Sequence, residues 1–311
     1  MIRLALLGLA AALSATAAAA QEAEDGAAPD QRNAAVGSDF FYSADADDTD
    51  VVRLGFDLDW LNEGPEKYRG VRVEKAWFNP SGAGWRGRER VYLRGADNLG
   101  GWKWNARLGT DGDTVLGAAT IHNDKPARHE YFIERDIIET PQGLRRGLYY
   151  TFAGAAFDLP VDDRNQFTLL AGLQEFTGDN LRTHLRANYI HVVKPQWGLS
   201  AQVRARLFRN SDPREFDYYS PRWYAQLLPV VQVRRFTDSG MRYLVAGGIG
   251  AQRDSATGWR RSSYFNAQVT SPPRRNWSFD AGFLFSETPT GSGTDNSYRY
   301  TQFNLGLRRS L

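Results

Sequence analysis

Side chains that could perform acid–base or nucleophilic chemistry are sparse in this sequence. Its four histidines are His122, His129, His184 and His191, and none belongs to an HExxH motif, a GxSxG motif or a set with metal-ligand spacing. The chain has no cysteine, which excludes a thiol nucleophile, a disulfide and a cysteine-based metal site. His184 follows a predicted surface turn and is the one candidate base for a hydrolase, but a structural histidine is the simpler interpretation. The sequence therefore predicts no catalytic residue, no metal site and no other cofactor.

Arginines spaced two residues apart are the more numerous chemical groups. Arg88 and Arg90 form one such pair, and Arg204 and Arg206 form another. Residues two apart lie on the same face of a strand, so the side chains of each pair point the same way. Guanidinium groups on one face brace a wall by pairing with carboxylates, and they also set the electric field of a pore. The predicted pore-lining residues are Arg53, Asp57, Arg88, Arg90, Arg107, Arg186, Arg204, Arg206 and Arg234.

These residues belong to segments in which apolar and polar side chains alternate. In residues 52–60 the even positions are Val, Leu, Phe, Leu and Trp, whereas Arg53 and Asp57 occupy odd positions. Residues 199–207 alternate in the same way. Period-two alternation predicts β-strands with one apolar face, which a soluble sandwich also has. Most segments reach the ~9–11 residues that a tilted strand needs to cross a bilayer, which favours a barrel with lipid outside and water inside.

The number of such segments predicts an all-β fold, a transmembrane antiparallel up-and-down barrel of about sixteen strands. The count falls to about fourteen if the two weakest segments, residues 39–46 and 128–139, are not strands. Most of the even-numbered connections are short and turn-rich, as periplasmic turns are, although residues 61–67 are longer. Residues 211–222 and 287–296 form longer connections typical of the outer side, and the contrast is clearer in the second half of the chain. The predicted strands are residues 39–46, 51–60, 68–78, 86–95, 101–109, 114–123, 128–139, 147–158, 166–177, 181–194, 198–210, 223–236, 241–253, 259–270, 276–286 and 297–309.

The beginning of the chain predicts export from the cytoplasm. Residues 1–20 contain Arg3, an apolar stretch and a final run of alanines ending in Ala18-Ala19-Ala20, which is the pattern of a secretory signal peptide cut before Gln21. Residues 21–38 are rich in Ala, Asp, Glu and Gln and lack aromatic residues, so we expect a disordered acidic leader. The barrel is predicted over residues 39–311. Together these features predict the outer membrane of a Gram-negative bacterium after cleavage of the signal peptide.

Composition narrows the class of partner. The mean hydropathy of −0.51 argues against a helical membrane protein, and no stretch of ~18 consecutive apolar residues is present. The 38 basic and 36 acidic residues leave a formal charge of +2, which gives no overall attraction for nucleic acid. The expected partners are outer-membrane lipid on the apolar face and a solute in the lumen.

Two stretches resemble the C-terminal barrels of exopolysaccharide-export porins. Residues 217–224 read Asp-Tyr-Tyr-Ser-Pro-Arg-Trp-Tyr, which is similar to the Tyr-Tyr/Phe-Ser-Pro segment that opens a strand in those barrels. Residues 176–182 are similar to the Gly/Asp/Asn turn, closed by an arginine, that precedes it. The family comprises the porins for poly-N-acetylglucosamine and for cellulose, and the resemblance covers residues 134–236. The residues that carry it are Phe176, Asp179, Asn180, Arg182, Tyr219, Ser220 and Pro221.

The resemblance implies an outer-membrane porin that exports an exopolysaccharide. Members of that family usually carry a long helical repeat domain before the barrel, whereas only residues 21–38 separate the predicted signal peptide from the first strand here. A periplasmic scaffold, where one exists, is then expected to be a separate protein. A general or solute-selective diffusion porin and a surface receptor or phage-adsorption barrel remain as alternatives.

Overall fold

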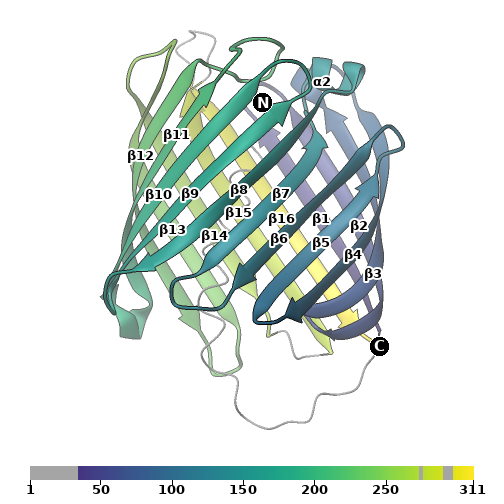
Figure 1. The fold of residues 1–311 in the computed structure, drawn as a ribbon, viewed down its shortest axis with the longest axis vertical. Coiled ribbons are helices and arrows are strands. Elements are labelled where there is room, and N and C mark those ends of the chain that lie inside the picture. Colours follow the sequence, from purple (N-terminus) through teal and green to yellow (C-terminus); the bar gives the residue numbers. More distant parts are fainter. Residues whose placement is uncertain (1–33, 273–275, 290–296) are drawn as a thin grey trace.

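Sixteen strands form one closed antiparallel barrel in the computed structural model, which describes residues 34–272, 276–289 and 297–311 (Figure 1). Each strand pairs with its neighbours along the chain, and β1 pairs with β16 to close the sheet. The predicted all-β barrel and its larger strand number are confirmed, and the fallback of fourteen is wrong. The predicted signal peptide lies outside the described residues, within which no helix is long and apolar enough to cross a membrane.

Strand bounds follow the predicted segments closely. The strands are β1 (Ala35–Asp45), β2 (Asp50–Gly64), β3 (Lys67–Asn79), β4 (Arg86–Leu99), β5 (Trp102–Thr110), β6 (Val115–Asn123), β7 (His129–Ile137), β8 (Tyr149–Pro160), β9 (Asn165–Phe176), β10 (Leu181–Lys194), β11 (Leu199–Asn210), β12 (Trp223–Phe236), β13 (Arg242–Asp254), β14 (Arg260–Thr270), β15 (Trp277–Pro289) and β16 (Ser297–Ser310).

Both of the weakest predicted strands are present, with shifted ends. β1 begins at Ala35, before the predicted residue 39, because Ala35 pairs with Asp59 on one side and with Ser310 on the other. The pair with Ser310 belongs to the closure of the barrel. Backbone pairs of this kind do not depend on side-chain type, so the sequence pattern does not reveal them. β7 ends at Ile137, earlier than predicted, because the chain then turns into the barrel.

Alternation assigns the two faces as predicted. Phe56, Val203, Leu207 and Phe283 are exposed, and every one lies on the apolar outward face. Residues of the opposite parity face inward, since their side chains contact strands that are not neighbours in the sheet. Arg90 on β4, for example, contacts Asp136 on β7. The outward face therefore carries most of the exposed apolar side chains, and the ion-paired arginines such as Arg90 lie inside.

The two ends of the barrel differ. The start of β1 and the end of β16 lie at one end, which is the periplasmic end in bacterial barrels of this kind. Turns at that end are tight. Gly198 closes the one after β10 in the left-handed conformation, where a Cβ would lie 1.7 Å from the Arg234 carbonyl oxygen. The opposite end carries the longer connections and the short helix α2 (Pro141–Arg146), seen at the upper end in Figure 1.

Helix α2 occupies a connection predicted from sequence to be a loop. Thr140 caps its first turn, where the hydroxyl accepts a hydrogen bond from the Gly143 N–H, and Pro141 follows the cap. Gly147 ends the helix with a φ of 67°, a left-handed conformation that favours glycine. A capping threonine, a proline at the first helical position and a terminal glycine are sequence signals of a helix, so α2 could have been predicted from the sequence.

Candidate pore and outer mouth

One part of the inner wall is a network of ion pairs, here named the ion-paired sector and formed by the inner faces of β1–β4 and β7. Arg72 lies 2.5 Å from Asp39, 3.2 Å from Asp57 and 2.9 Å from Glu74. Arg94 pairs with Asp57 as well. Guanidinium groups that contact several carboxylates fix neighbouring strands relative to one another. This sector therefore acts as a brace.

Two arginines extend the brace across the interior. The Arg90 side chain is 1% exposed and lies 3.1 Å from Glu74 and 3.0 Å from Asp136. Arg53 on β2 pairs with Glu139, which follows β7. Arg90 is thus enclosed by protein, and its role in the described structure is to join β3, β4 and β7.

A second part of the inner wall, here named the basic sector, consists of the inner faces of β10, β11 and β12. These three strands contain no aspartate or glutamate. Arg186 on β10 is the direct cross-strand partner of Arg206 on β11. Arg204 donates to the Gln202 side chain at 2.8 and 3.0 Å and lies over the Tyr264 ring. The two sectors therefore differ in charge, although both are rich in arginine.

A row of aromatic rings crosses the inner wall from β7 to β12. Ring centroids lie 5.0 Å apart for Phe132 and Phe152, 4.9 Å for Phe152 and His184, 5.7 Å for His184 and Phe208, and 4.8 Å for Phe208 and Tyr224. We name these five residues the ring row. All of them are buried. Such spacings are typical of interacting aromatic pairs.

Glycines make room for two of these rings. A Cβ on Gly154 would lie 2.7 Å from Phe132 Cζ, and a Cβ on Gly172 would lie 2.7 Å from Phe152 Cε2. Each ring therefore lies against the backbone of an adjacent strand, a position that a larger residue at either glycine would block.

Two inward-folded connections cover the ring row at the end opposite the termini. The first, the α2 connection (residues 138–148), places Ile138 against Phe132 and Phe152 and is held to β4 by the Arg88 guanidinium, which donates to the Leu144 carbonyl oxygen. The second, the Tyr218 connection (residues 211–222), stacks Tyr218 on Phe176 with centroids 4.5 Å apart. Together they form the outer mouth.

Asp217 joins the two connections. Its carboxylate accepts a hydrogen bond from the Thr140 hydroxyl at 2.5 Å and another from the Gln142 backbone N–H at 2.8 Å. Arg146 of the α2 connection also lies over the ring of Phe216, with 5.7 Å between guanidinium and centroid. The closed arrangement of the mouth thus depends on a small set of contacts around one aspartate.

The two stretches that resemble export porins meet at this mouth. Arg182 donates to Asn210 at 2.8 Å and to the Tyr219 carbonyl oxygen at 2.5 Å, and its guanidinium lies between the rings of Phe176 and Phe208. Asn180 donates to the Tyr218 hydroxyl at 2.9 Å. Residues 176–182 therefore anchor the Tyr218 connection to the barrel wall.

The remaining residues of the two stretches contribute in different ways. The Ser220 hydroxyl accepts from the Arg214 N–H at 2.8 Å, and the Pro221 carbonyl oxygen accepts from the Asn210 side chain. Asp179 is exposed and takes part through its backbone N–H, which donates to Glu215 at 2.7 Å. Burial raises the pKa of the Tyr218 phenol, so it stays protonated and donates to Glu215.

Comparison with known proteins identifies the fold. No protein family model and no curated protein matches the chain. Among solved structures, a bacterial polysaccharide outer membrane secretin is similar with a TM-score of 0.66 at 13% identity, over 90% of this chain and 99% of that one. Pseudomonas aeruginosa OprD and OccK5 (OpdH) each give a TM-score of 0.45 at 9% identity, covering 93% and 89% of this chain and 98% of each of theirs. The chain thus has the porin-like fold of an outer-membrane β-barrel.

All predicted pore-lining residues lie on the inner face, and the structure divides them. Arg53, Asp57, Arg88 and Arg90 take part in ion pairs, and Arg107 lies over the Tyr92 ring. The other four belong to the basic sector: Arg186, Arg204, Arg206 and Arg234.

His184 has the surroundings of a structural residue. It is fully buried, its Nε2 lies 3.0 Å from the Gln174 side-chain oxygen, and Phe152 and Phe208 flank its ring. Sequence reasoning missed the ring row, Glu139 and the joining role of Asp217. The only available signal for Asp217 was its place at the start of the stretch 217–224.

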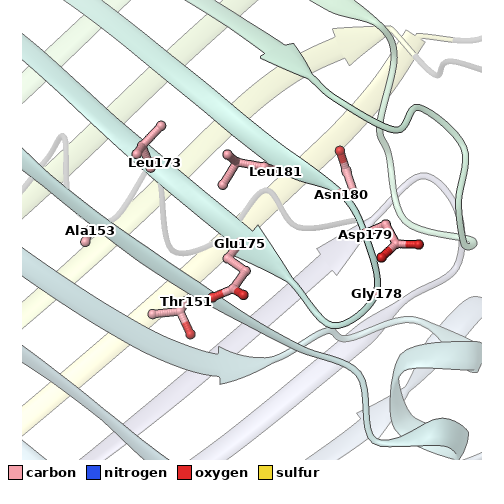
Figure 2. A pocket seen from close by; sticks show the side chains of 8 residues that line it. All are labelled: Thr151, Ala153, Leu173, Glu175, Gly178, Asp179, Asn180 and Leu181. Carbon is pink, nitrogen blue, oxygen red and sulfur yellow. The ribbon is translucent and has the colours of Figure 1, made fainter.

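A shallow depression of about 500 Å³ lies on the outward side of the wall (Figure 2). It is lined by side chains of β8 and β9, such as Thr151, Leu173 and Glu175, and by the turn at Gly178. Leu173 is exposed on the apolar face, so the depression opens away from the barrel interior. It is therefore separate from the candidate pore.

Proposed function

We propose that this protein is an outer-membrane channel that exports a polysaccharide, reaching that membrane after its signal peptide is removed. The observation that carries the proposal is the contact between residues 176–182 and 217–224 at the mouth of a sixteen-stranded barrel. The two stretches that resemble export porins are separated by 34 residues in the sequence, and they build one structure there. The likeness in fold to a polysaccharide outer membrane secretin, over 99% of that chain, supports the same function.

The inner wall offers a sugar chain contacts that are weak and replaceable. Barrels of about sixteen strands are wide enough to hold a water-filled lumen. Aromatic faces pack on the apolar faces of sugar rings, and the ring row supplies them near the mouth. Glutamines and arginines of β11 and β12, such as Gln202, Arg204 and Gln226, supply hydrogen bonds to hydroxyl groups. Each contact must stay weak, because a polymer that is held tightly does not move.

Export requires the outer mouth to open. The α2 connection and the Tyr218 connection cover the ring row and are joined at Asp217. Arg182 anchors the Tyr218 connection to β10, and Arg53 and Arg88 hold the α2 connection to β2 and β4. We expect the two connections to separate at Asp217 while each keeps its own anchor. A separate periplasmic protein delivers the polymer in this proposal.

Deletion of the gene tests the proposed function. Polymer synthesis should continue, surface polysaccharide should disappear and polymer should accumulate in the periplasm, and the intact gene should restore export. The Arg253→Gln variant, altered on the outward face, is the matched control and should restore export equally. Unchanged surface polysaccharide together with lower permeability to small solutes would instead identify a general diffusion porin. Crosslinking in intact cells, followed by identification of a periplasmic protein bound near the β10–β11 turn, tests the scaffold.

A further inference from the structure

Arginine and tryptophan side chains gather on the outward face of the wall near the outer mouth. Arg209 is the last residue but one of β11, Arg253 is the last but one of β13, and Arg261 is the second of β14. Trp223 begins β12 as the direct partner of Arg209, and the Arg253 guanidinium lies 5.5 Å from the centroid of the Trp223 ring. Trp259 precedes β14 and is exposed. We name these five residues the outer arginine cluster.

The cluster faces the membrane and not the lumen. Leu207 is exposed on the outward apolar face, and Arg209 shares that face because it lies two residues further along β11. Ala225 is the direct partner of both Leu207 and Arg253, so Arg253 points the same way. Arg261 is paired with the residue two positions before Arg253 and therefore lies on this face as well. All three arginines are exposed.

The charge of the cluster is not balanced by its own strands. The only acidic residue of β11–β14 is Asp254, which is 1% exposed. Its carboxylate accepts hydrogen bonds from the Tyr219 hydroxyl and from two backbone N–H groups of the connection after β13. Among the residues that the structure describes, no carboxylate forms an ion pair with an arginine of the cluster. Elsewhere on the outward face Lys75 is paired with Glu89 at 2.6 Å, so the cluster is a local feature of β11–β14.

The spacing of the arginines suits a phosphate group. Arg253 and Arg261 are diagonal neighbours on adjacent strands, and such residues lie about 7–8 Å apart. The Arg261 Nε donates to the Ser263 hydroxyl at 3.1 Å, which holds that guanidinium on the outward face. The ring of Trp223 supports the Arg253 guanidinium there. Guanidinium donors match the oxygens of a phosphate in pairs, so two arginines at this distance reach one phosphate placed between them.

The tryptophans place the cluster at the level of lipid headgroups. Trp223 and Trp259 are 37% and 59% exposed, and tryptophan rings prefer the boundary between acyl chains and water. Exposed Leu207 and Leu227 lie further from the strand ends on the same face, so the stems of the arginines lie beside apolar surface while their charged groups reach the boundary. The termini lie at the periplasmic end, and the cluster at the opposite end therefore faces the outer leaflet.

We infer that the outer arginine cluster binds the phosphate groups of a lipid in the outer leaflet, whose acyl chains lie on the apolar face at Leu207 and Leu227. In Gram-negative bacteria the main lipid of that leaflet is lipopolysaccharide, and its lipid A anchor carries phosphates. The guanidinium groups attract such an anion, and the tryptophan rings keep them at its depth. The inference goes beyond the proposed function, because the site lies on the opposite side of the wall from the lumen.

Binding of lipid A to the purified full-length protein tests the site. Fluorescent lipid A and the same lipid after removal of its phosphates are titrated in micelles of an uncharged detergent and followed by anisotropy. We expect the phosphorylated lipid to bind at least about tenfold more tightly at low salt, because each arginine near an anionic lipid contributes about fivefold. The preference should fall as the Debye length shrinks from about 30 Å at 0.01 M salt to about 3 Å at 1 M.

Variants locate the binding. Arg209→Gln and Arg261→Gln should each weaken binding of phosphorylated lipid A about fivefold. The triple variant, which adds Arg253→Gln, should bind the two forms of the lipid equally. Arg309→Gln is the matched control, since Arg309 is also exposed and lies 5.1 Å from the ring centroid of Trp277, but at the end of the barrel that holds the termini. It should bind as the parent does, and heat-modifiable gel mobility shows whether each variant is folded.

A second measurement separates a lipid from a free anion. Inorganic phosphate at the concentration of the lipid should not displace it, because it has no acyl chains to lie on the apolar face. Lipid A in vesicles of phosphatidylcholine should slow unfolding of the parent and not of the triple variant, and in phosphatidylcholine alone the two should unfold alike. The inference is overturned by equal binding of the two forms of lipid A to the parent, by a preference that survives in the triple variant, by an equal loss in Arg309→Gln, or by displacement with inorganic phosphate.

Discussion

Replacement of Asp217 by alanine should open the outer mouth. The carboxylate accepts hydrogen bonds from the Thr140 hydroxyl and the Gln142 N–H, and both donors belong to the α2 connection. Hydrogen bonds to a charged group contribute roughly 1.5–3 kcal/mol each, and Asp217 is only half-buried, so the lower figure applies and water regains part of it. We therefore expect the closed mouth to lose about 2–3 kcal/mol in Asp217→Ala.

That loss predicts a measurable change in channel opening. Each 1.4 kcal/mol corresponds to about a tenfold change in an equilibrium constant, so the ratio of open to closed channels should rise about 30- to 150-fold. Single-channel recordings in planar bilayers measure this ratio directly. Asp217→Asn keeps one acceptor oxygen and should give an intermediate value.

Asp179→Ala is the matched control for this measurement. It removes an exposed carboxylate from the same end of the barrel, and the contact of Asp179 with the mouth is made by its backbone N–H. Its open-to-closed ratio should equal that of the parent. The reasoning is refuted if Asp217→Ala and Asp179→Ala give the same ratio while both show the gel mobility of a folded barrel.

Three further predictions concern stability, each measured by denaturant unfolding of protein refolded in lipid vesicles. Arg90→Met leaves Glu74 and Asp136 buried without Arg90 and should lower the free energy of unfolding by about 3–5 kcal/mol. The outward-facing control Arg253→Met should lower it by less than about 0.5 kcal/mol. Similar losses in both variants would show that Arg90 does not brace the wall. Phe303→Arg on the lipid face should cost about 2–4 kcal/mol, and Asn304→Arg, beside Asp280 on the inner face, much less; equal costs would mean that the faces are misassigned. Gly172→Ala places a Cβ 2.7 Å from Phe152 and should lower the free energy of unfolding by about 1–3 kcal/mol. Gly247→Ala, whose nearest contact is 3.8 Å away, should lower it far less. A Gly172→Ala variant as stable as the parent would contradict the packing of the ring row.

Strand positions could be predicted because the barrel has lipid on one side and a polar interior on the other. In β11 the two environments impose strict alternation, so the predicted bounds and faces agree with the structure. In β2 the predicted faces agree, but the strand continues to Gly64, beyond the predicted residue 60, because its register shifts after Asp59 and the alternation ends there. The start of β1 could not be read in this way. Ala35 is held by backbone pairs with β2 and with β16, the last strand of the sequence. Such pairs do not depend on side-chain type, so they cannot be predicted from the pattern of residues.

The arrangement of the mouth could not be predicted from the sequence for a different reason. Contacts such as Arg53 with Glu139, and Asp217 with Thr140, join residues that meet only after the sheet has closed. A single sequence shows residue types and not such pairings. One clue was present, since Leu144 is an apolar residue in a predicted connection, and an apolar residue there indicates burial.

The anchors of the mouth give the barrel a mechanical property. The α2 connection is fixed to β2 and β4, and the Tyr218 connection is fixed to β10 and β13 through Arg182 and through Tyr219, whose hydroxyl lies 2.6 Å from Asp254. These anchors lie on different parts of the circumference of the barrel, and Asp217 links the two connections that they hold. Any change that makes the circular cross-section more oval stretches the Asp217 hydrogen bonds and the contact of Arg146 with Phe216. We therefore expect lateral tension in the surrounding bilayer to change the aperture of the mouth through these few contacts.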